Sequence, residues 1–257
     1  MKLKLLLFAG MLILGTAGLY AQQIIAHRGY WKTDGSAQNS LASLRKADSI
    51  RVYGSEVDFW LSADGVPVVN HDATVTLNGE KIRVEETPLA TLRQVKLSNG
   101  ETLPTVEEYL DAFATCSHTR LIIEFKTHSS KEREAELARK VIGMVRERGL
   151  QEKVEYISFG LHFVQQVRMI EPQAKVYYLN GDLSPNVLAA IGAAGFDYHY
   201  NVVYKRPQWV QAAHGLGLKV NIWTVNRPED IQQIIDLKAD FITTDEPLLV
   251  RETIEKQ

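Results

Sequence analysis

The sequence predicts an α/β protein, a (β/α)8 TIM barrel with an extra antiparallel hairpin strand after the second barrel strand. Three observations predict this fold class. Short β-branched runs alternate with amphipathic stretches, helix-capping residues fall between the runs, and a length of 257 residues suits one such barrel. No internal repeat and no linker divides the chain, so we expect residues 22–257 to form a single domain.

Nine apolar runs are candidates for strands. They span residues 24–26, 55–59, 66–69, 121–125, 154–158, 175–179, 196–200, 218–225 and 241–243. The second and third runs are too close for the helix that joins parallel strands, and the Asp-Gly pair at 64–65 is a hairpin signal. These two runs should therefore pair antiparallel, with His71 opposite Glu56, and eight parallel strands remain.

Helix signals fall between the runs. Thr105 with Glu108 forms a capping box, and Ser129 with Glu132 forms another, ahead of a charged helix. An Asn-Gly pair at 78–79 predicts a small hairpin between the third and fourth strands.

Composition and charge exclude several classes of protein. With 45% hydrophobic and 23% charged residues, the chain is globular rather than disordered. Its 29 basic and 31 acidic residues give a net charge of −2, so there is no overall basic field for nucleic acid. The single cysteine, Cys116, excludes an internal disulfide and a zinc site built from cysteines.

Residues 1–21 have the pattern of a secretory signal peptide. Lys2 and Lys4 precede the apolar run 5–20, and Ala21 is a small residue at a possible cleavage point. The alternative is a membrane anchor, but the run is 16 residues long and broken by glycines, whereas a spanning helix needs roughly 20 apolar residues. We therefore expect a periplasmic or secreted protein without stable membrane insertion; the sequence leaves its oligomeric state open.

Ionisable residues cluster at the ends of two predicted strands. Glu56 and Asp58 are two apart on one strand, as are Glu124 and Lys126 on another, so each pair projects from one face. Buried charges without partners are costly, whereas carboxylates that converge at a barrel mouth suit an oxygen-coordinated ion. We therefore expect Glu56, Asp58 and Glu124 to hold one divalent cation, Ca²⁺ or Mg²⁺.

Seven short motifs are spread over the chain from residue 24 to about residue 250. They are His-Arg-Gly (27–29), Glu-Val-Asp (56–58), Asp-Gly-Val-Pro-Val-Val-Asn-His-Asp (64–72), Leu-Pro-Thr-Val-Glu-Glu (103–108), Ile-Glu-Phe-Lys (123–126), Trp-Thr-Val-Asn (223–226) and Thr-Thr-Asp-Glu-Pro (243–247). In kind and order they resemble those of the glycerophosphodiester phosphodiesterases. The resemblance implies metal-dependent hydrolysis of a small-molecule phosphodiester to glycerol 3-phosphate and an alcohol.

The resemblance also implies a role for each matching residue. His27 and His71 would share the work of acid and base, Arg28 and Lys126 would bind the phosphate, and Trp223 would face the polyol. The three carboxylates named above would bind the metal. Which histidine is the acid, and whether water or a neighbouring glycerol hydroxyl attacks phosphorus, stay open.

Gln38 is a departure from the family pattern. The family usually has Pro-Glu-Asn-Thr where this chain has Ala-Gln-Asn-Ser at 37–40, so a neutral amide replaces a carboxylate of the same shape. This difference motivates a rival hypothesis, a non-catalytic binding protein for polyol phosphates or phosphodiesters. A third hypothesis is a phospholipase of the same barrel superfamily. Retention of both His27 and His71 favours an enzyme, because binding alone needs no acid and base.

The remaining histidines have simpler interpretations. His199, with Asp197 on the same strand face, is either a substrate contact or a structural histidine. Four others are expected at the surface, namely His118, His128, His162 and His214.

Overall fold

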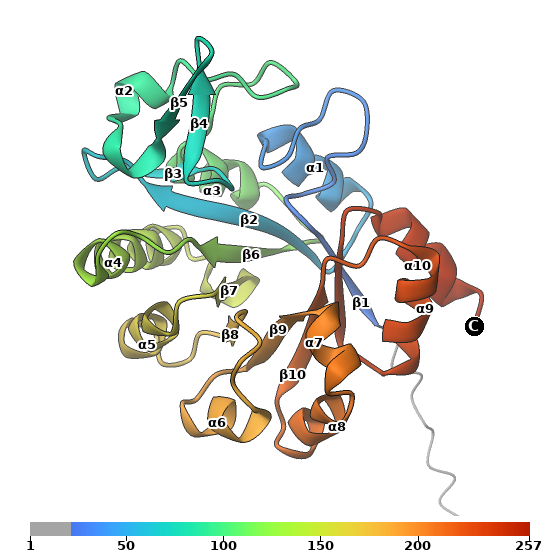
Figure 1. Cartoon of the computed structure of the whole chain (residues 1–257). Coiled ribbons are helices and arrows are strands. Elements are labelled where there is room, and N and C mark those ends of the chain that lie inside the picture. Colours follow the sequence, from blue (N-terminus) through green and yellow to red (C-terminus); the bar gives the residue numbers. More distant parts are fainter. Residues whose placement is uncertain (1–21) are drawn as a thin grey trace, which may run out of the picture.

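A closed barrel of eight parallel strands is the centre of the computed structural model, which describes residues 22–257 (Figure 1). The ring runs through β1 (Gln23–Ala26), β2 (Gly54–Leu61), β6 (Arg120–Phe125), β7 (Val154–Ser158), β8 (Val176–Tyr178), β9 (Gly195–His199), β10 (Lys219–Trp223) and β11 (Phe241–Thr244), which pairs with β1. Strands of such a sheet are covered on both faces, which explains their nearly continuous apolar sequences. The predicted fold class is confirmed.

Helices cover the outside of the barrel. They are α1 (Leu41–Ser49), α3 (Val106–Ala114), α4 (Lys131–Glu147), α5 (Leu161–Ile170), α6 (Pro185–Ala190), α7 (Tyr200–Lys205), α8 (Gln208–Gly215), α9 (Pro228–Asp236) and α10 (Pro247–Glu255), with a 3-10 turn, η2 (Gln151–Lys153), before β7. The capping box of Thr105 and Glu108 opens α3 as predicted. The second predicted box is wrong by one residue, because Ser130 rather than Ser129 caps α4 by accepting the Arg133 N–H.

The extra strand β3 (Pro67–Val69) lies outside the ring and pairs antiparallel with β2. Its register differs from the prediction by one residue, because Val69 lies opposite Phe59. The predicted register leaves a loop of two residues, but the structure has three, 63–65, and the left-handed Gly65, at φ +76°, lengthens the turn. The strand also ends at Val69, so the predicted pairing of His71 with Glu56 is wrong and His71 lies in the loop beyond.

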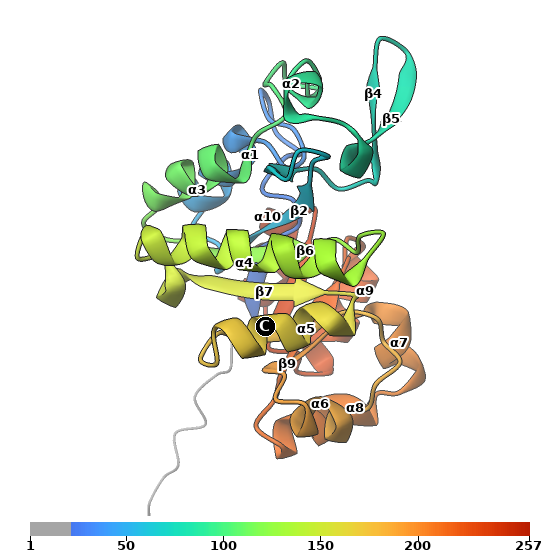
Figure 2. The ribbon, with the colours of Figure 1, turned by 90° about the vertical axis from the view of Figure 1, so that its left-hand side faces the viewer.

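An insertion between β3 and α3 forms a second, small apolar core. It comprises β4 (Thr74–Leu77), β5 (Glu80–Arg83), the 3-10 turn η1 (Val84–Glu86) and α2 (Leu89–Leu92). The predicted hairpin turn is present, with positive φ at both Asn78 and Gly79. The insertion core consists of Trp60, Val68, Val75, Val84, Leu92, Val95 and Leu103. In Figure 2 the β4–β5 hairpin projects on the side toward which the arrow of β7 points, so the insertion stands beside the barrel mouth.

None of the helices in residues 22–257 is long and apolar enough to cross a bilayer. The predicted signal peptide at residues 1–21 lies outside the described residues.

Candidate active site

Three buried carboxylates converge at the C-terminal end of the barrel. Glu56 and Asp58 project inward from β2 and Glu124 from the adjacent β6, and one oxygen of each lies within 4.8 Å of the others. Their exposed fractions are 2%, 1% and 8%. The two-residue spacing puts both acids of β2 on one face, and the parallel register places Asp58 beside Glu124.

The electrostatics of this carboxylate cluster favour a bound cation. Burial, followed by the charges of Asp58 and Glu124, raises the pKa of Glu56 well above its ordinary value. Burial and Asp58 raise the pKa of Glu124 to about 7. The Glu56 Oε1 atom is buried and has no hydrogen-bond partner among the described residues. An all-oxygen cluster with surplus negative charge and an orphaned oxygen fits a hard divalent ion such as Ca²⁺ or Mg²⁺.

Two basic side chains border the carboxylate cluster. The Lys126 ammonium lies 2.7 Å from Glu124 Oε1 and 3.1 Å from Asp58 Oδ1. The Arg28 backbone N–H donates to Glu56 Oε2 at 2.7 Å, and its Nε lies 3.7 Å from Asp58 Oδ2. Burial acts to raise the pKa of Asp58, but Lys126 and its other neighbours hold that pKa below its ordinary value. An anion at this position would meet both basic side chains at once.

Gln38 contacts Arg28. Its Oε1 accepts a hydrogen bond from Arg28 Nη1 at 2.7 Å, so the amide performs the orienting contact that a carboxylate would make. The next residue, Asn39, donates to Asp58 Oδ2 and accepts the Asp58 N–H, which fixes that acid from both sides. Gln38 therefore acts on the guanidinium directly and on the carboxylate cluster only through Arg28.

Gln38→Glu should change the site without abolishing turnover. A carboxylate there would form an ion pair with Arg28 and withdraw some of its positive charge from a phosphate, so we expect KM to rise by about 2- to 10-fold. Metal affinity should rise slightly, because the added charge lies beyond Arg28. Kinetics and metal titrations of the variant would measure both effects; an unchanged KM would contradict the role given to the Gln38–Arg28 contact.

His27, at the end of β1, forms a pair with Asp245, which follows β11. Its Nδ1 lies 2.8 Å from Asp245 Oδ1, and that carboxylate also accepts bonds from Trp31 Nε1 and Asn226 Nδ2. An Nδ1–H donated to a carboxylate leaves Nε2 as the nitrogen that can exchange a proton. The sequence predicts no role for Asp245, although this residue lies in the Thr-Thr-Asp-Glu-Pro motif. Asp245 follows the last strand, which neighbours the first strand in a closed barrel, and this position could have indicated its contact with His27.

Asp245→Asn should lower the free energy of unfolding at neutral pH. That free energy should also depend less on pH in the acidic range than it does in the wild type. Burial opposes ionisation, but hydrogen bonds from His27 and others lower the pKa of Asp245 from 3.8 to about 2. The folded state thus gains about 2 kcal/mol above pH 4, and this gain disappears as pH falls through about 2. Urea unfolding of wild type and variant at pH 7 and pH 2.5 would measure this gain. An equal stability difference between the two proteins at both pH values would contradict the prediction.

His71 forms a second histidine–aspartate pair on the insertion side of the mouth. Its Nδ1 lies 2.7 Å from Asp72 Oδ1, and its carbonyl accepts a bond from Trp60 Nε1. Burial lowers the pKa of His71. A cavity of about 310 Å³ is lined by Arg28, Trp31, Ala37, Gln38, Asn39, Val69, Asn70, His71, Asp72, Leu97 and Ser98. His71 and Arg28 therefore face one space.

Trp223 lies on the same rim but outside the charged group. Its Nε1 donates to the Asp197 carbonyl, and its ring lies against His199 at 5.1 Å and Phe159 at 5.6 Å. His199 also caps α7 by accepting the Asn201 N–H, which is a structural role. Asp197 is buried behind this rim, and burial and Glu124 raise its pKa.

The surface prediction is wrong for one histidine. His118 and His214 are exposed and His162 is half-buried, but His128 is only 7% exposed. It follows β6 and lies against the rings of Trp60 and Phe163.

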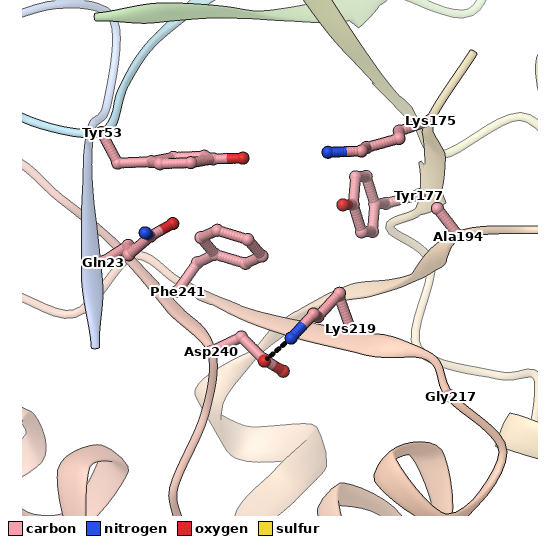
Figure 3. Close-up of a pocket in the computed structure, with 9 residues that line it drawn as sticks. All are labelled: Gln23, Tyr53, Lys175, Tyr177, Ala194, Gly217, Lys219, Asp240 and Phe241. Carbon is pink, nitrogen blue, oxygen red and sulfur yellow. Dashed lines mark hydrogen bonds and ion pairs between the residues drawn. The ribbon is translucent and has the colours of Figure 1, made fainter. Parts of the chain in front are cut away.

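A larger cavity, of about 460 Å³, lies at the opposite end of the barrel (Figure 3). Its charged groups are paired within the protein: Lys219 with Asp240 at 2.6 Å, and Lys175 with the buried Glu155 at 3.3 Å. In barrels of this class the N-terminal ends of the strands serve stability rather than chemistry. The candidate site lies at the other end, with its three carboxylates, its two histidine–aspartate pairs and the basic side chains of Arg28 and Lys126.

Comparison with known proteins identifies the family of the chain. Residues 27–249 match the model of the glycerophosphoryl diester phosphodiesterase family. A glycerophosphodiester phosphodiesterase of Caldanaerobacter subterraneus subsp. tengcongensis is 28% identical over 237 residues, which cover 87% of this chain and 94% of that protein.

Solved structures of similar proteins have the same fold. The crystal structure of a glycerophosphodiester phosphodiesterase from Parabacteroides distasonis is 42% identical, with a TM-score of 0.88, and the match covers 92% of this chain and 98% of that one. A phosphodiesterase of Oleispira antarctica, solved with the product sn-glycerol-3-phosphate, is 24% identical with a TM-score of 0.79 and matches over 92% of this chain and 98% of that chain. The protein therefore belongs to the glycerophosphoryl diester phosphodiesterase family of enzymes.

Proposed function

We propose that this protein hydrolyses glycerophosphodiesters to glycerol 3-phosphate and an alcohol with the help of one divalent cation. The observation that carries the proposal is the convergence of Glu56, Asp58 and Glu124 at a mouth that Arg28 and Lys126 also border. A phosphodiester is an anion with a poor leaving group, so its hydrolysis needs charge neutralisation, a nucleophile and a proton donor. The family to which the chain belongs supports the choice of substrate class.

Each group has a part in this chemistry. A cation bound by the three carboxylates would neutralise charge on the non-bridging oxygens. Lys126 and Arg28 would hold the remaining phosphate oxygens. His27 and His71, each oriented by an aspartate at Nδ1, would take the proton of the nucleophile and give one to the leaving oxygen through Nε2. Trp223 would border the polyol.

Release of glycerol 3-phosphate from a panel of glycerophosphodiesters tests the proposal. The protein is stripped of metal, and Ca²⁺, Mg²⁺ and other divalent ions are restored one at a time. Turnover only with a divalent ion is the expected result. Tight binding of the same compounds without turnover would instead identify a binding protein.

We also propose that residues 1–21 are a cleaved signal peptide and that the mature protein is periplasmic or secreted. The basic start, the short apolar run and Ala21 support this proposal. Mass spectrometry of the protein from its native host tests it, and an intact Met1 on a cytoplasmic protein would contradict it.

A further inference from the structure

We infer that His128 is a positioning residue for Lys126: as a neutral imidazole, it fixes the peptide from which the Lys126 ammonium reaches the carboxylate cluster. This inference rests on the proposed function, in which Lys126 binds the phosphate. His128 itself touches neither the carboxylates nor the cavity at the mouth.

Both ring nitrogens of His128 are engaged with backbone. Its Nδ1 lies 2.7 Å from the Lys126 carbonyl oxygen, and its Nε2 lies 3.0 Å from the Leu61 nitrogen. A carbonyl can only accept and an N–H can only donate, so Nδ1 must carry the proton and Nε2 must be the acceptor. These two partners define a single tautomer of a neutral ring. A protonated ring would face the Leu61 N–H with a second N–H.

The position of these bonds explains why they matter. The ladder between β2 and β6 ends at the pair Phe59–Phe125, and the Lys126 N–H still donates to the Phe59 carbonyl. Beyond this point the strands separate, because β2 continues into its hairpin with β3. Leu61 N–H and the Lys126 carbonyl would then lack strand partners, and the His128 ring supplies both.

The surroundings hold the ring still. Trp60 lies 4.9 Å from it and Phe163 lies 6.4 Å from it, between ring centroids. The charged groups that act on it are Glu85 from η1 and Arg133 and Glu134 from α4. Burial, the largest influence, lowers the pKa of His128, which agrees with an accepting Nε2.

Lys126 is sensitive to its backbone position. Its ammonium must reach Glu124 Oε1 and Asp58 Oδ1 together, at 2.7 and 3.1 Å, from a side chain with four rotatable bonds. A displacement of its peptide would change which carboxylate it pairs with and where it presents positive charge to a phosphate. Misplacement of a binding group by about 1 Å can cost about 10²-fold in rate.

Two substitutions of His128 separate its two bonds. In His128→Asn the side-chain amide can occupy the place of Nδ1 and still donate to the Lys126 carbonyl, while the Leu61 N–H loses its partner. In His128→Gln the amide oxygen can occupy the place of Nε2 and accept from Leu61, while the Lys126 bond is lost. Both variants lose the ring contact with Trp60, and they differ from each other by one methylene group.

Kinetics of the matched pair test the inference. We expect His128→Gln to lower kcat/KM by about 10- to 100-fold and His128→Asn by no more than about 3-fold, at similar melting temperatures. In the Lys126→Met background, His128→Gln should have almost no further effect, because its target is absent. The same two substitutions at His162, which pairs with Glu134 rather than with Lys126, are the control and should leave kcat/KM unchanged.

A binding measurement, which does not require turnover, distinguishes the positioning role of His128 from the proposed hydrolysis. Glycerol 3-phosphate binding to the metal-loaded protein, measured by calorimetry, should weaken in His128→Gln and be nearly unchanged in His128→Asn. A wild type without activity that still shows this pattern would contradict the proposed hydrolysis and support the positioning role. Two results would overturn the inference by showing that His128 only stabilises the fold. One is an equal loss of kcat/KM in His128→Asn and His128→Gln. The other is an undiminished effect of His128→Gln in the Lys126→Met background.

Discussion

Replacing His27 or His71 with Asn is expected to lower kcat by about 10²- to 10⁴-fold, the usual contribution of a general acid or base. Each imidazole holds an aspartate through Nδ1, at 2.8 Å for His27 and 2.7 Å for His71. Asparagine can keep that hydrogen bond but has no group at the place of Nε2. KM should change little, because the proposed mechanism assigns phosphate binding to Arg28 and Lys126. Steady-state kinetics of both variants measure the loss.

The pH profile of kcat/KM identifies which step each histidine serves. The wild type should show a bell-shaped profile, and each single variant should lose one limb, since one histidine must be neutral and the other protonated. His214→Gln is the control, because His214 also pairs with an aspartate, Asp240, through Nε2, which a glutamine amide can replace, and it lies at the far end of the barrel. Full turnover by the double variant His27→Asn, His71→Asn would disprove this mechanism.

Removing the divalent cation is expected to abolish turnover, and Glu56→Gln should have nearly the same effect. The isosteric amide keeps an oxygen in place but removes one of three charges that attract the ion. The carboxylate cluster then retains Asp58 and Glu124, both of which are already paired with Lys126. Activity after chelation, and after each ion is restored, measures the dependence.

Thermal unfolding gives a second readout of the same change. Burial, followed by the charges of Asp58 and Glu124, raises the pKa of Glu56, so an ionised Glu56 opposes folding near neutral pH when metal is absent. Glu56→Gln should therefore be at least as stable as wild type without metal. Saturating Ca²⁺ or Mg²⁺ should raise the stability of wild type by about 3 kcal/mol at 100 times its Kd, and that of the variant far less.

A surface control completes the experiment. Glu252→Gln, on the exposed side of α10, should keep the wild-type response to metal. An equal metal-induced shift in Glu56→Gln and wild type would show that Glu56 is not a ligand.

Residues fixed by strand periodicity could be placed from the sequence. Glu56 and Asp58 alternate with outward residues along β2, and the parallel ladder sets Asp58 beside Glu124, so a period of two and a barrel topology are sufficient to bring them together. From the sequence, His71 could be placed at the barrel mouth, but its position relative to β2 could not be predicted correctly. One left-handed glycine, Gly65, lengthened the turn, and a change of one residue alters every pairing beyond it.

Residues that depend on distant segments could not be placed. His128 follows a strand in the polar stretch 127–130, which is typical of an exposed loop. It is buried because Trp60 from β2 and Phe163 from α5 close over it, and neither contact has a local signal. Asp245 is 218 positions from His27, and only closure of the ring brings them into contact.

The two histidines of the site rest on different hydrophobic cores. His27 extends from a strand of the main barrel, whereas His71 is held by a carbonyl contact with Trp60, a member of the insertion core. That core has seven buried side chains among the described residues, so it should open at a lower free energy than the barrel. Amides of the insertion should exchange with solvent before those of β6 and β7. Mild denaturant should then stop turnover while the barrel is still folded. Loss of activity would therefore measure local unfolding of the insertion rather than unfolding of the whole protein.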